Sequence, residues 1–401
     1  MTVPDPIDLV VRVLRPDEYR AARDLFSVAV HHPPVTDQQW AGLESSYEPD
    51  RTLGGFVDGE LVGTAMSFAS RIGLPGGTSL PLAAVPDVGV RADHTRRGVA
   101  TALIRELLVS VTEPLARLWA SEGEIYGRFG FGISEWGGEI VLDRRTAVLR
   151  PDAPTGGAVR LVSWDEALKV LPEIFERTGL ARNGAMTRPD FYWRQQRVFG
   201  EIRGEFRRIA VHRGPDGVDD GFVMFFVAGR DPHRLNVIDL HTANPRAWAG
   251  LWRFLLGVDL VDEVRAEDRP LDEPLRWLFT DPRACRVAEV GDGSWLRLVD
   301  VPSALAARSY RDGEPVVIEV SDPFLPANSG RYRISVDGAV RTDEPAGIAL
   351  DVSALASLYL GGTRASALAA AGRLRVLDPA ALARADRLFD ADVPPWCGTF
   401  F

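Results

Sequence analysis

The sequence predicts an α+β fold, with mixed helices and strands, divided among three domains. The chain has 401 residues, more than a single hydrophobic core usually serves. Segments with strand-like and helix-like hydrophobic periodicity alternate along its whole length. The order of elements in residues 1–150 returns loosely in residues 151–292, and a third group of strands and amphipathic helices fills residues 293–401.

The first region contains the clearest turn signals. Asp17 is the expected N-cap of a helix that runs through Phe26. Asp58-Gly59 lies between two apolar runs and predicts a tight hairpin. The strands expected in this region cover residues 9–14, 52–57, 60–69, 82–90 and 115–120, and further helices cover residues 98–112 and 125–129.

The second and third regions follow the same periodicity rules. In the second, we expect helices at 164–177, 188–197 and 247–256 and strands at 206–212, 222–227 and 235–240. In the third, we expect strands at 316–320, 332–336 and 347–352 and helices at 353–360, 364–371 and 379–389. Apolar faces on these last helices predict packing against a sheet.

Composition and charge restrict the classes of function. The chain is 46% hydrophobic and 25% charged, as an ordinary globular protein is. Its net charge of −10 and the lack of a basic run argue against nucleic-acid binding and favour cationic ligands. No apolar run is long enough for a transmembrane segment, and no signal peptide is expected. We expect a cytoplasmic protein, with secretion or export to a host cell as an open alternative.

Two further residue types carry weaker signals. Cys285 and Cys397 are expected to be reduced thiols, with one disulfide between them as the alternative. His31 and His32 have no Cys or His partner at ligand spacing, so we interpret them as part of a loop and expect no metal.

A strand that leads into a helix carries the first chemical motif. The strand contains Val88, Gly89 and Val90, and residues 95–101 read TRRGVAT. The first N–H groups of a helix lack acceptors and favour phosphate, and a glycine lets a phosphate approach the backbone. Arg96 and Arg97 add two permanent cations. A plain strand–turn–helix unit with solvated arginines explains residues 96–100 equally well.

A second motif decides between these readings. Residues 121–132, SEGEIYGRFGFG, place a tyrosine on a short helix after the next strand. A tyrosine hydroxyl can act as a general acid, although a packed core aromatic is the alternative for Tyr126. At this separation the two motifs resemble the GCN5-related N-acetyltransferase fold, in which acetyl-CoA lies between two diverging strands and the tyrosine protonates the leaving thiolate. The first position of that family's phosphate motif is Gln or Arg, whereas Thr95 stands here.

The segment 121–132 and the C-terminal sequence WCGTFF (396–401) resemble more closely the Eis (enhanced intracellular survival) family of acetyltransferases. The resemblance covers the whole chain. It implies a catalytic domain at 1–150, a second acetyltransferase-like domain at 151–292 and a sterol-carrier-like domain at 293–401. It also implies that the terminal carboxylate of Phe401 is the general base, that aminoglycosides are acetylated at several amines, and that the chain forms a homohexamer.

The resemblance also assigns a set of site residues. Tyr126 and Phe401 are the expected catalytic residues, and Asp24, Trp40 and Glu44 are candidates for the acceptor pocket. The residues expected to bind acetyl-CoA are Val88, Gly89, Val90, Arg96, Arg97, Gly98, Val99, Ala100, Thr101, Ser121 and Glu122.

The second domain lacks an Arg-Gly pair after its strand, where residues 241–246 read HTANPR instead. We therefore expect it to be a scaffold that binds no coenzyme. Two alternatives for the function stay open: acetylation of protein lysines or polyamines, and a non-catalytic sensor of acyl-CoA or lipid. A general acid argues against the sensor, because a protein that only binds has no use for one.

Overall fold

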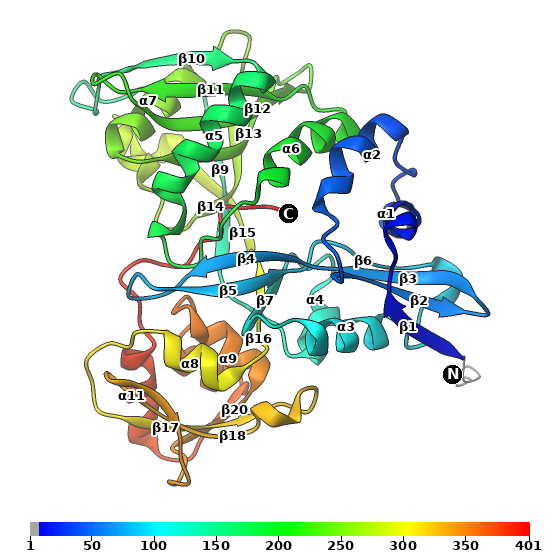
Figure 1. The fold of residues 1–401 in the computed structure, drawn as a ribbon. Helices are drawn as coiled ribbons and strands as arrows, with labels where there is room; N and C mark the ends of the chain where they lie inside the picture. Colours follow the sequence, from blue (N-terminus) through cyan, green and yellow to red (C-terminus); the bar gives the residue numbers. More distant parts are fainter. Residues whose placement is uncertain (1–7) are drawn as a thin grey trace. The chain divides into compact units, whose positions relative to one another are not determined.

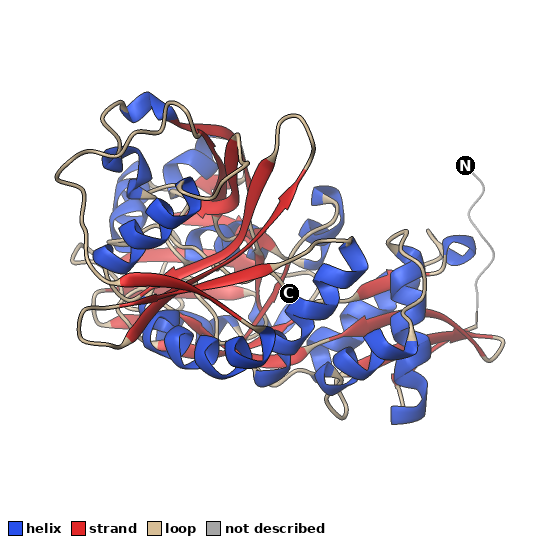
Figure 2. Ribbon diagram, turned by 90° about the horizontal axis from the view of Figure 1, so that it is seen from above, coloured by secondary structure: helices blue, strands red, loops and turns tan. Residues whose placement is uncertain are grey.

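The computed structural model describes residues 8–401, and these divide into two compact units. Residues 8–134, 294–391 and 401 form the first unit, and residues 135–293 and 392–400 form the second. Helices and strands are mixed in the described residues, as an α+β fold requires (Figure 2). The expectation of no signal peptide rests on the start of the chain, and residues 1–7 lie outside the described residues. Across the described part, no helix is long and apolar enough to cross a membrane.

The N-terminal part of the first unit contains two sheets with the strand orders β1-β2-β3-β6 and β4-β5-β7-β16-β8 (Figure 1). Helix α3 covers the first sheet, and its buried leucines and valines share one core with β2, β3 and β7. The elements are β1 (Leu9–Val13), α1 (Tyr19–Ala29), α2 (Asp37–Leu43), β2 (Thr52–Val57), β3 (Glu60–Met66), β4 (Phe68–Gly73), β5 (Ser79–Ala84), β6 (Val88–Val90), α3 (Val99–Ser110), β7 (Leu115–Leu118), α4 (Gly123–Tyr126), β8 (Gly132–Ile133) and β16 (Trp295–Leu298).

Two expected strands are each divided in the structure. The strand expected at 60–69 breaks at Ser67, because β3 pairs with β2 and β6 while β4 pairs with β5 of the other sheet. The strand expected at 82–90 breaks at residues 85–87. Pro86 has no N–H for a ladder, which is a sequence signal for this break. The Asp58-Gly59 hairpin forms as expected, with positive φ at both residues.

The expected cap at Asp17 is wrong. The chain forms a short turn at Pro16–Glu18, and α1 begins at Tyr19. The Asp17 carboxylate lies 3.3 Å from the Arg15 guanidinium instead. Arg12 binds Glu18 at 2.7 Å, so neighbouring arginines take both acidic side chains that could have capped the helix.

Two strands pair with partners that are distant in the sequence. Strand β9 (Trp136–Asp143) was not among the expected strands; it lies within residues 1–150 but pairs with β14 and β15 of the second unit. Strand β16 was not among the expected strands either; it lies within residues 293–401 but pairs with β7 and β8 of the first unit. The residue pattern within one segment does not show which sheet completes a strand's hydrogen bonds.

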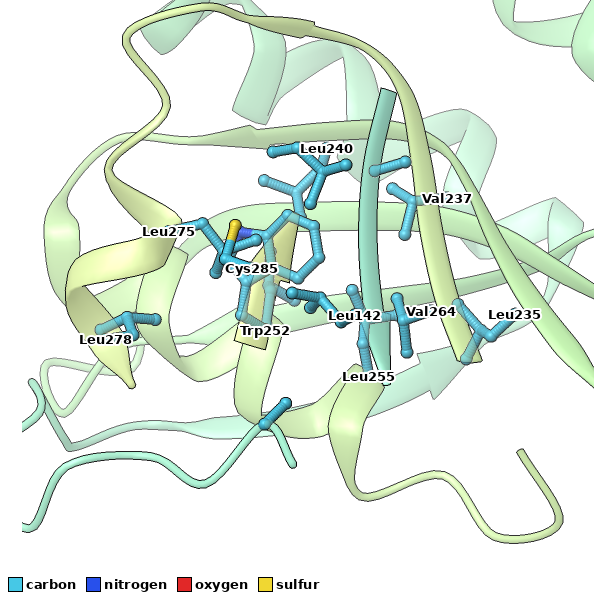
Figure 3. Close-up of a cluster of buried hydrophobic side chains, with 14 of the residues drawn as sticks. Leu142, Leu235, Val237, Leu240, Trp252, Leu255, Val264, Leu275, Leu278 and Cys285 are labelled. Atoms are coloured by element: carbon cyan, nitrogen blue, oxygen red, sulfur yellow. The ribbon is translucent and has the colours of Figure 1, made fainter. Parts of the chain in front are cut away.

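The second unit is built on one sheet with the order β10-β11-β12-β13-β14-β9-β15. Figure 3 shows Trp252 and Cys285 among the leucines of its core. Cys285 and Cys397 are both buried and are not joined in a disulfide, as expected. The remaining elements are β10 (Ala158–Val162), α5 (Trp164–Thr178), α6 (Asp190–Arg203), β11 (Arg208–Arg213), β12 (Asp219–Ala228), β13 (Arg234–Thr242), α7 (Pro245–Leu256), β14 (Glu263–Pro270) and β15 (Cys285–Asp292).

The C-terminal part of the first unit has a separate sheet with the order β19-β18-β17-β20-β21. A buried ion pair of 2.6 Å between Arg297 of β16 and Asp322 connects it to the N-terminal part. Its elements are α8 (Val301–Ala307), β17 (Val316–Ser321), β18 (Gly330–Ser335), β19 (Gly338–Arg341), β20 (Ile348–Asp351), α9 (Val352–Tyr359), α10 (Ala365–Ala370), β21 (Leu374–Val376) and α11 (Pro379–Leu388).

Candidate active site

Two parallel strands of the first unit diverge beside the predicted motifs. Strand β5 pairs with β7 from Leu82–Leu115 to Ala84–Arg117, and one more backbone hydrogen bond joins Val85 to Arg117. Beyond this row of residues, β6 forms ladder hydrogen bonds only with β3. No backbone ladder therefore joins β6 to the end of β7. Unpaired backbone groups between diverging strands can bind an amide-containing ligand.

Helix α3 begins at this divergence with an open N-terminus. Its N-cap is Gly98, which adopts a left-handed conformation with φ of 87° and supplies no capping side chain. A Cβ at Gly98 would meet nothing within 4 Å. The first N–H groups of α3 are therefore available to an anion, and the helix dipole favours one.

The two predicted cations flank that helix start. Among the described residues, neither Arg96 nor Arg97 has an ion-pair partner. Arg91 in the same loop, by contrast, is bound to Asp93 at 2.7 Å and Glu60 at 3.0 Å. The Thr95 hydroxyl donates to the carbonyl of Ala92 and so closes the turn instead of extending toward a ligand. The arrangement fits a phosphate-rich co-substrate.

Tyr126 lies in the buried core beside β6 and the end of β7. It ends α4, and its side chain shares a cluster with Val85 and Leu118 against which Val88 and Val90 pack. Burial raises the pKa of Tyr126 above its ordinary value of 10, although a hydrogen bond with Ser121 acts in the opposite direction. The nearby charge of Glu122 adds to the increase in this pKa. The phenol is therefore protonated at neutral pH, as a general acid must be.

The chain terminus contacts the first unit through an aromatic pair. The rings of Phe401 and Phe68 meet edge to face, with 5.6 Å between their centroids. Phe68 pairs with Ala84 of β5, and Ala84 pairs with Arg117 of β7. Phe401 therefore packs beside the row of the sheet where the β5–β7 ladder ends, a position that the family resemblance implied and that sequence spacing alone could not predict.

The three acceptor candidates lie in and around α1 and α2. Asp24 accepts the N–H of Val35 at 3.1 Å and faces Arg20 at 3.3 Å. Trp40 packs against Tyr47, with 5.3 Å between ring centroids, and Arg20 also lies over its ring. Arg20 therefore already supplies a cation to both Asp24 and Trp40. Glu44 is exposed at the end of α2.

Sequence reasoning missed a buried ion pair beside the divergence. Asp87, in the break between β5 and β6, binds Arg23 of α1 at 3.1 Å, and both side chains are nearly buried. Burial raises the pKa of Asp87, while the Arg23 charge lowers it without restoring the ordinary value. Pro86-Asp87 inside a strand pattern was the available signal for a charged break.

The second unit repeats the strand divergence but not the open helix start. Strands β13 and β14 are paired and parallel only from Arg234–Glu263 to Val237–Ala266. Helix α7 follows, and the Asn244 side chain accepts the N–H of Ala247 at 2.9 Å. Pro245 removes a further donor. This helix start is satisfied by its own sequence.

Metal-ligating residues do not gather in the described part of the chain: no group of three or more His, Cys, Asp or Glu side chains there could hold an ion.

Comparison with known proteins agrees with this architecture. Two acetyltransferase (GNAT) domain models match residues 10–134 and 184–298, and a sterol carrier protein domain model matches residues 301–398. The chain is 38% identical to the N-acetyltransferase Eis of Mycobacterium bovis over 84% of each chain. It is 36% identical to an uncharacterized N-acetyltransferase of Streptomyces avermitilis over 96% of this chain and 98% of that protein.

Solved structures show the same fold along the whole chain. The crystal structure of Eis1 from Mycobacterium abscessus matches with a TM-score of 0.87 and 38% identity, over 98% of this chain and all of the other. A GCN5-related N-acetyltransferase from Anabaena variabilis, at 19% identity, shares the fold with a TM-score of 0.84 over 98% of this chain. The expected fold, tandem acetyltransferase domains followed by a sterol-carrier domain, is confirmed, and the chain belongs to the Eis family of N-acetyltransferases.

Proposed function

We propose that this enzyme transfers the acetyl group of acetyl-CoA directly to primary amines of a small cationic acceptor, with aminoglycosides as the first substrate class. The divergence of β6 and β7 beside an uncapped α3 and a buried, protonated Tyr126 is the observation that carries the proposal. Acetyl-CoA supplies an activated thioester. The net charge of −10 concentrates cationic acceptors around the chain.

Each part of the site has a role in the transfer. The N–H groups at the start of α3, with Arg96 and Arg97, hold the phosphates. Val88, Gly89 and Val90, with Ser121 and Glu122, border the acyl-bearing arm. The amine nitrogen bonds to the thioester carbon while the carbon–sulfur bond breaks. The Phe401 carboxylate accepts the amine proton, through water, and the Tyr126 hydroxyl donates its proton to sulfur.

The terminal carboxylate suits this role chemically. Its reference pKa, about 3.5, keeps it ionised at neutral pH, so it attracts an ammonium group and can receive a proton. The edge-to-face contact between Phe401 and Phe68 supports a position close to the point where the strands diverge. The second acetyltransferase domain, whose helix start is capped by Asn244, is proposed to bind no coenzyme.

An acceptor panel tests the proposal. Thiol release from acetyl-CoA is measured with an aminoglycoside, a polyamine and a lysine peptide, and mass analysis counts the acetyl groups on each product. We expect fastest turnover and multiple acetylation with the aminoglycoside. Preference for the peptide or polyamine would replace the acceptor class, and no release with any amine would refute the transfer itself.

Adding a few residues after Phe401 probes the base. The extended chain keeps the aromatic ring but moves the carboxylate, so kcat is expected to fall by about a hundredfold or more. An unchanged kcat would remove Phe401 from the mechanism. The homohexamer that the family resemblance implies is a separate proposal, and light scattering of the purified chain measures it directly.

A further inference from the structure

The last residues of the chain before Phe401 are bound inside the second unit. Trp396 donates its indole N–H to the Asp268 carbonyl at 2.6 Å and its backbone N–H to the Asn183 carbonyl at 2.9 Å. Its ring stacks on His241, with 5.5 Å between centroids and 27° between planes. The Arg269 guanidinium lies 4.8 Å from the same ring. We call residues 396–400 the tail.

A buried arginine of the domain also binds the tail. The Arg188 side chain has no solvent exposure and binds Asp239 at 2.6 Å. Its Nη2 donates to the Gly398 carbonyl at 2.6 Å, and its Nε donates to the Thr399 hydroxyl at 3.0 Å. The rigid guanidinium fork thus divides its donors between one carboxylate and two consecutive tail residues.

The charges around Arg188 are fixed by their surroundings. Burial acts to raise the pKa of Asp239, but the Arg188 cation and the His241 ring outweigh it and lower this pKa below its ordinary value. Burial lowers the pKa of His241, so its ring is neutral at pH 7. Its Nε2 lies 3.0 Å from Asp239, 3.1 Å from Arg188 Nη2 and 3.2 Å from the Gly398 carbonyl oxygen, so His241 belongs to the same polar cluster as the tail.

These residues lie where the second domain's strands diverge. The β13–β14 ladder ends at Val237–Ala266, and Asp239 and His241 follow on β13 while Asp268 follows on β14. Trp396 therefore bridges the two diverged strands, by stacking on one and donating to the other. In the first domain the corresponding divergence, between β6 and β7, is the proposed place for acetyl-CoA.

We infer that the second acetyltransferase domain binds the chain's own C-terminus in place of a ligand, and that Arg188, Asp239 and His241 are positioning residues for the Phe401 carboxylate. We call the three residues the tail socket. The inference rests on the proposed function of Phe401. Thr399, the last residue that Arg188 binds, is two peptide steps from Phe401, at most about 7 Å between Cα atoms, so a fixed tail limits the volume that the carboxylate can reach. Such restriction raises the effective concentration of a catalytic group.

Buried charge is a costly way to hold a tail. Desolvation offsets most of the attraction in a buried Arg–Asp pair. Apolar residues in place of Arg188 and Asp239 would therefore stabilise the domain about equally. A guanidinium fork, however, fixes direction as well as contact. We therefore expect the tail socket to affect turnover more than it affects stability.

Full-length variants test the tail socket. Arg188→Lys keeps the charge but loses the fork, and Thr399→Val removes the hydroxyl that accepts from Arg188 with little change of shape. Arg207→Lys is the matched control, because Arg207 is also a buried arginine of this domain, paired with Glu205 at 2.6 Å. Hydrogen exchange of the C-terminal peptide, thermal unfolding, kcat and the KM for acetyl-CoA are measured for each.

We expect faster exchange of the C-terminal peptide in both socket variants. A misplaced catalytic group costs up to about a hundredfold, so kcat should fall about tenfold for Thr399→Val and about a hundredfold for Arg188→Lys. The KM for acetyl-CoA should stay within about twofold, because those contacts are expected in the other unit. If Arg188→Lys does not fold, Thr399→Val carries the test.

Three outcomes would overturn the inference: unchanged exchange of the C-terminal peptide, faster exchange with unchanged kcat, or an equal loss of kcat in the Arg207 control. Failure of the proposed function is distinct from these. In that case the unaltered protein shows no turnover with any amine, while the exchange of its tail still responds to Thr399→Val.

Discussion

The two acetyltransferase domains place a helix after the same kind of diverging strand, but the two helices begin differently. Helix α3 begins at Gly98, which has no side chain and has open space around it. Helix α7 begins at Asn244, whose side chain already accepts the N–H of Ala247. A helix N-terminus binds an anion only if its donors are free. The comparison teaches that one fold can keep or lose a ligand site through the few residues at one turn.

The divergences themselves are also filled differently. Beside α3 the core contributes Tyr126, whose pKa is raised mainly by burial. Beyond the β13–β14 ladder, Trp396 of the chain's own tail stacks on His241 and binds the Asp268 carbonyl. The first domain therefore has the proposed proton donor and an uncapped helix start, whereas the divergence of the second is occupied by the chain's own tail.

Among the variants that test this difference between the two domains, removal of the Tyr126 hydroxyl is expected to have the largest effect on kcat. Tyr126→Phe should lower kcat by about 10²- to 10⁴-fold, because general acid catalysis contributes that much, and should leave the KM for acetyl-CoA nearly unchanged. The phenol is active when protonated. Its pKa lies above the ordinary 10, so the wild-type rate should decline only above pH 10.

Tyr310→Phe is the control, because that hydroxyl is also buried but binds the Leu305 carbonyl at 2.8 Å. It should cost about 1 kcal/mol of stability with no change in kcat. A Tyr126→Phe enzyme with wild-type kcat would contradict the general-acid role.

Neutralising Arg96 and Arg97 tests the proposed phosphate site. Arg96→Gln with Arg97→Gln should raise the KM for acetyl-CoA by about 10- to 100-fold at low salt, since each charged hydrogen bond contributes about 1.5–3 kcal/mol before screening by solvent. The difference should shrink as salt increases. Arg145→Gln with Arg375→Gln removes the same charge from exposed positions elsewhere, and an equal effect there would point to net charge alone.

An asparagine N-cap on α3, like the one on α7, tests the comparison between the two helix starts directly. Asn tolerates the left-handed conformation of Gly98, and its side chain can accept the N–H groups that a phosphate would use. Gly98→Asn should therefore raise the KM for acetyl-CoA about tenfold, or ~1.4 kcal/mol.

Gly372→Asn is the matched control for Gly98→Asn, because Gly372 also has a positive φ and nothing within 4 Å of an added Cβ. Wild-type KM in the Gly98 variant would show that the phosphates bind elsewhere.

The smallest effect is expected from removing the cap of α7. Asn244→Ala should lower the free energy of unfolding by about 1 kcal/mol, a typical value for an N-cap, without changing the KM for acetyl-CoA. Denaturant titration measures the first and steady-state kinetics the second. Ser163→Ala removes the corresponding cap of α5, where Glu166 donates at 3.2 Å, and should cost about as much. A changed KM in either variant would argue against a purely structural second domain.

Local patterns predicted most elements, the hairpin at Asp58-Gly59 and the two motifs that border the divergence. They failed where long-range pairing decides the outcome. The break at residues 85–87 was signalled by Pro86, but the split at Ser67 arises only because β3 and β4 belong to different sheets. The pairing of β9 with β14 and of β16 with β7 has the same cause, because these strands are distant in sequence.

The sequence by itself determined the fold class, the family and the chemical types gathered at residues 88–101 and 121–126, because these depend on short-range periodicity and on residue identity. Only the tertiary structure decided which groups are free to act. Arg96 and Arg97 stay unpaired among the described residues while Arg91 is bound to Asp93 and Glu60. Asp24 is engaged by Arg20, and the tail is bound by Arg188. The physical reason is that burial and partners, which set charge and availability, come from residues distant in sequence.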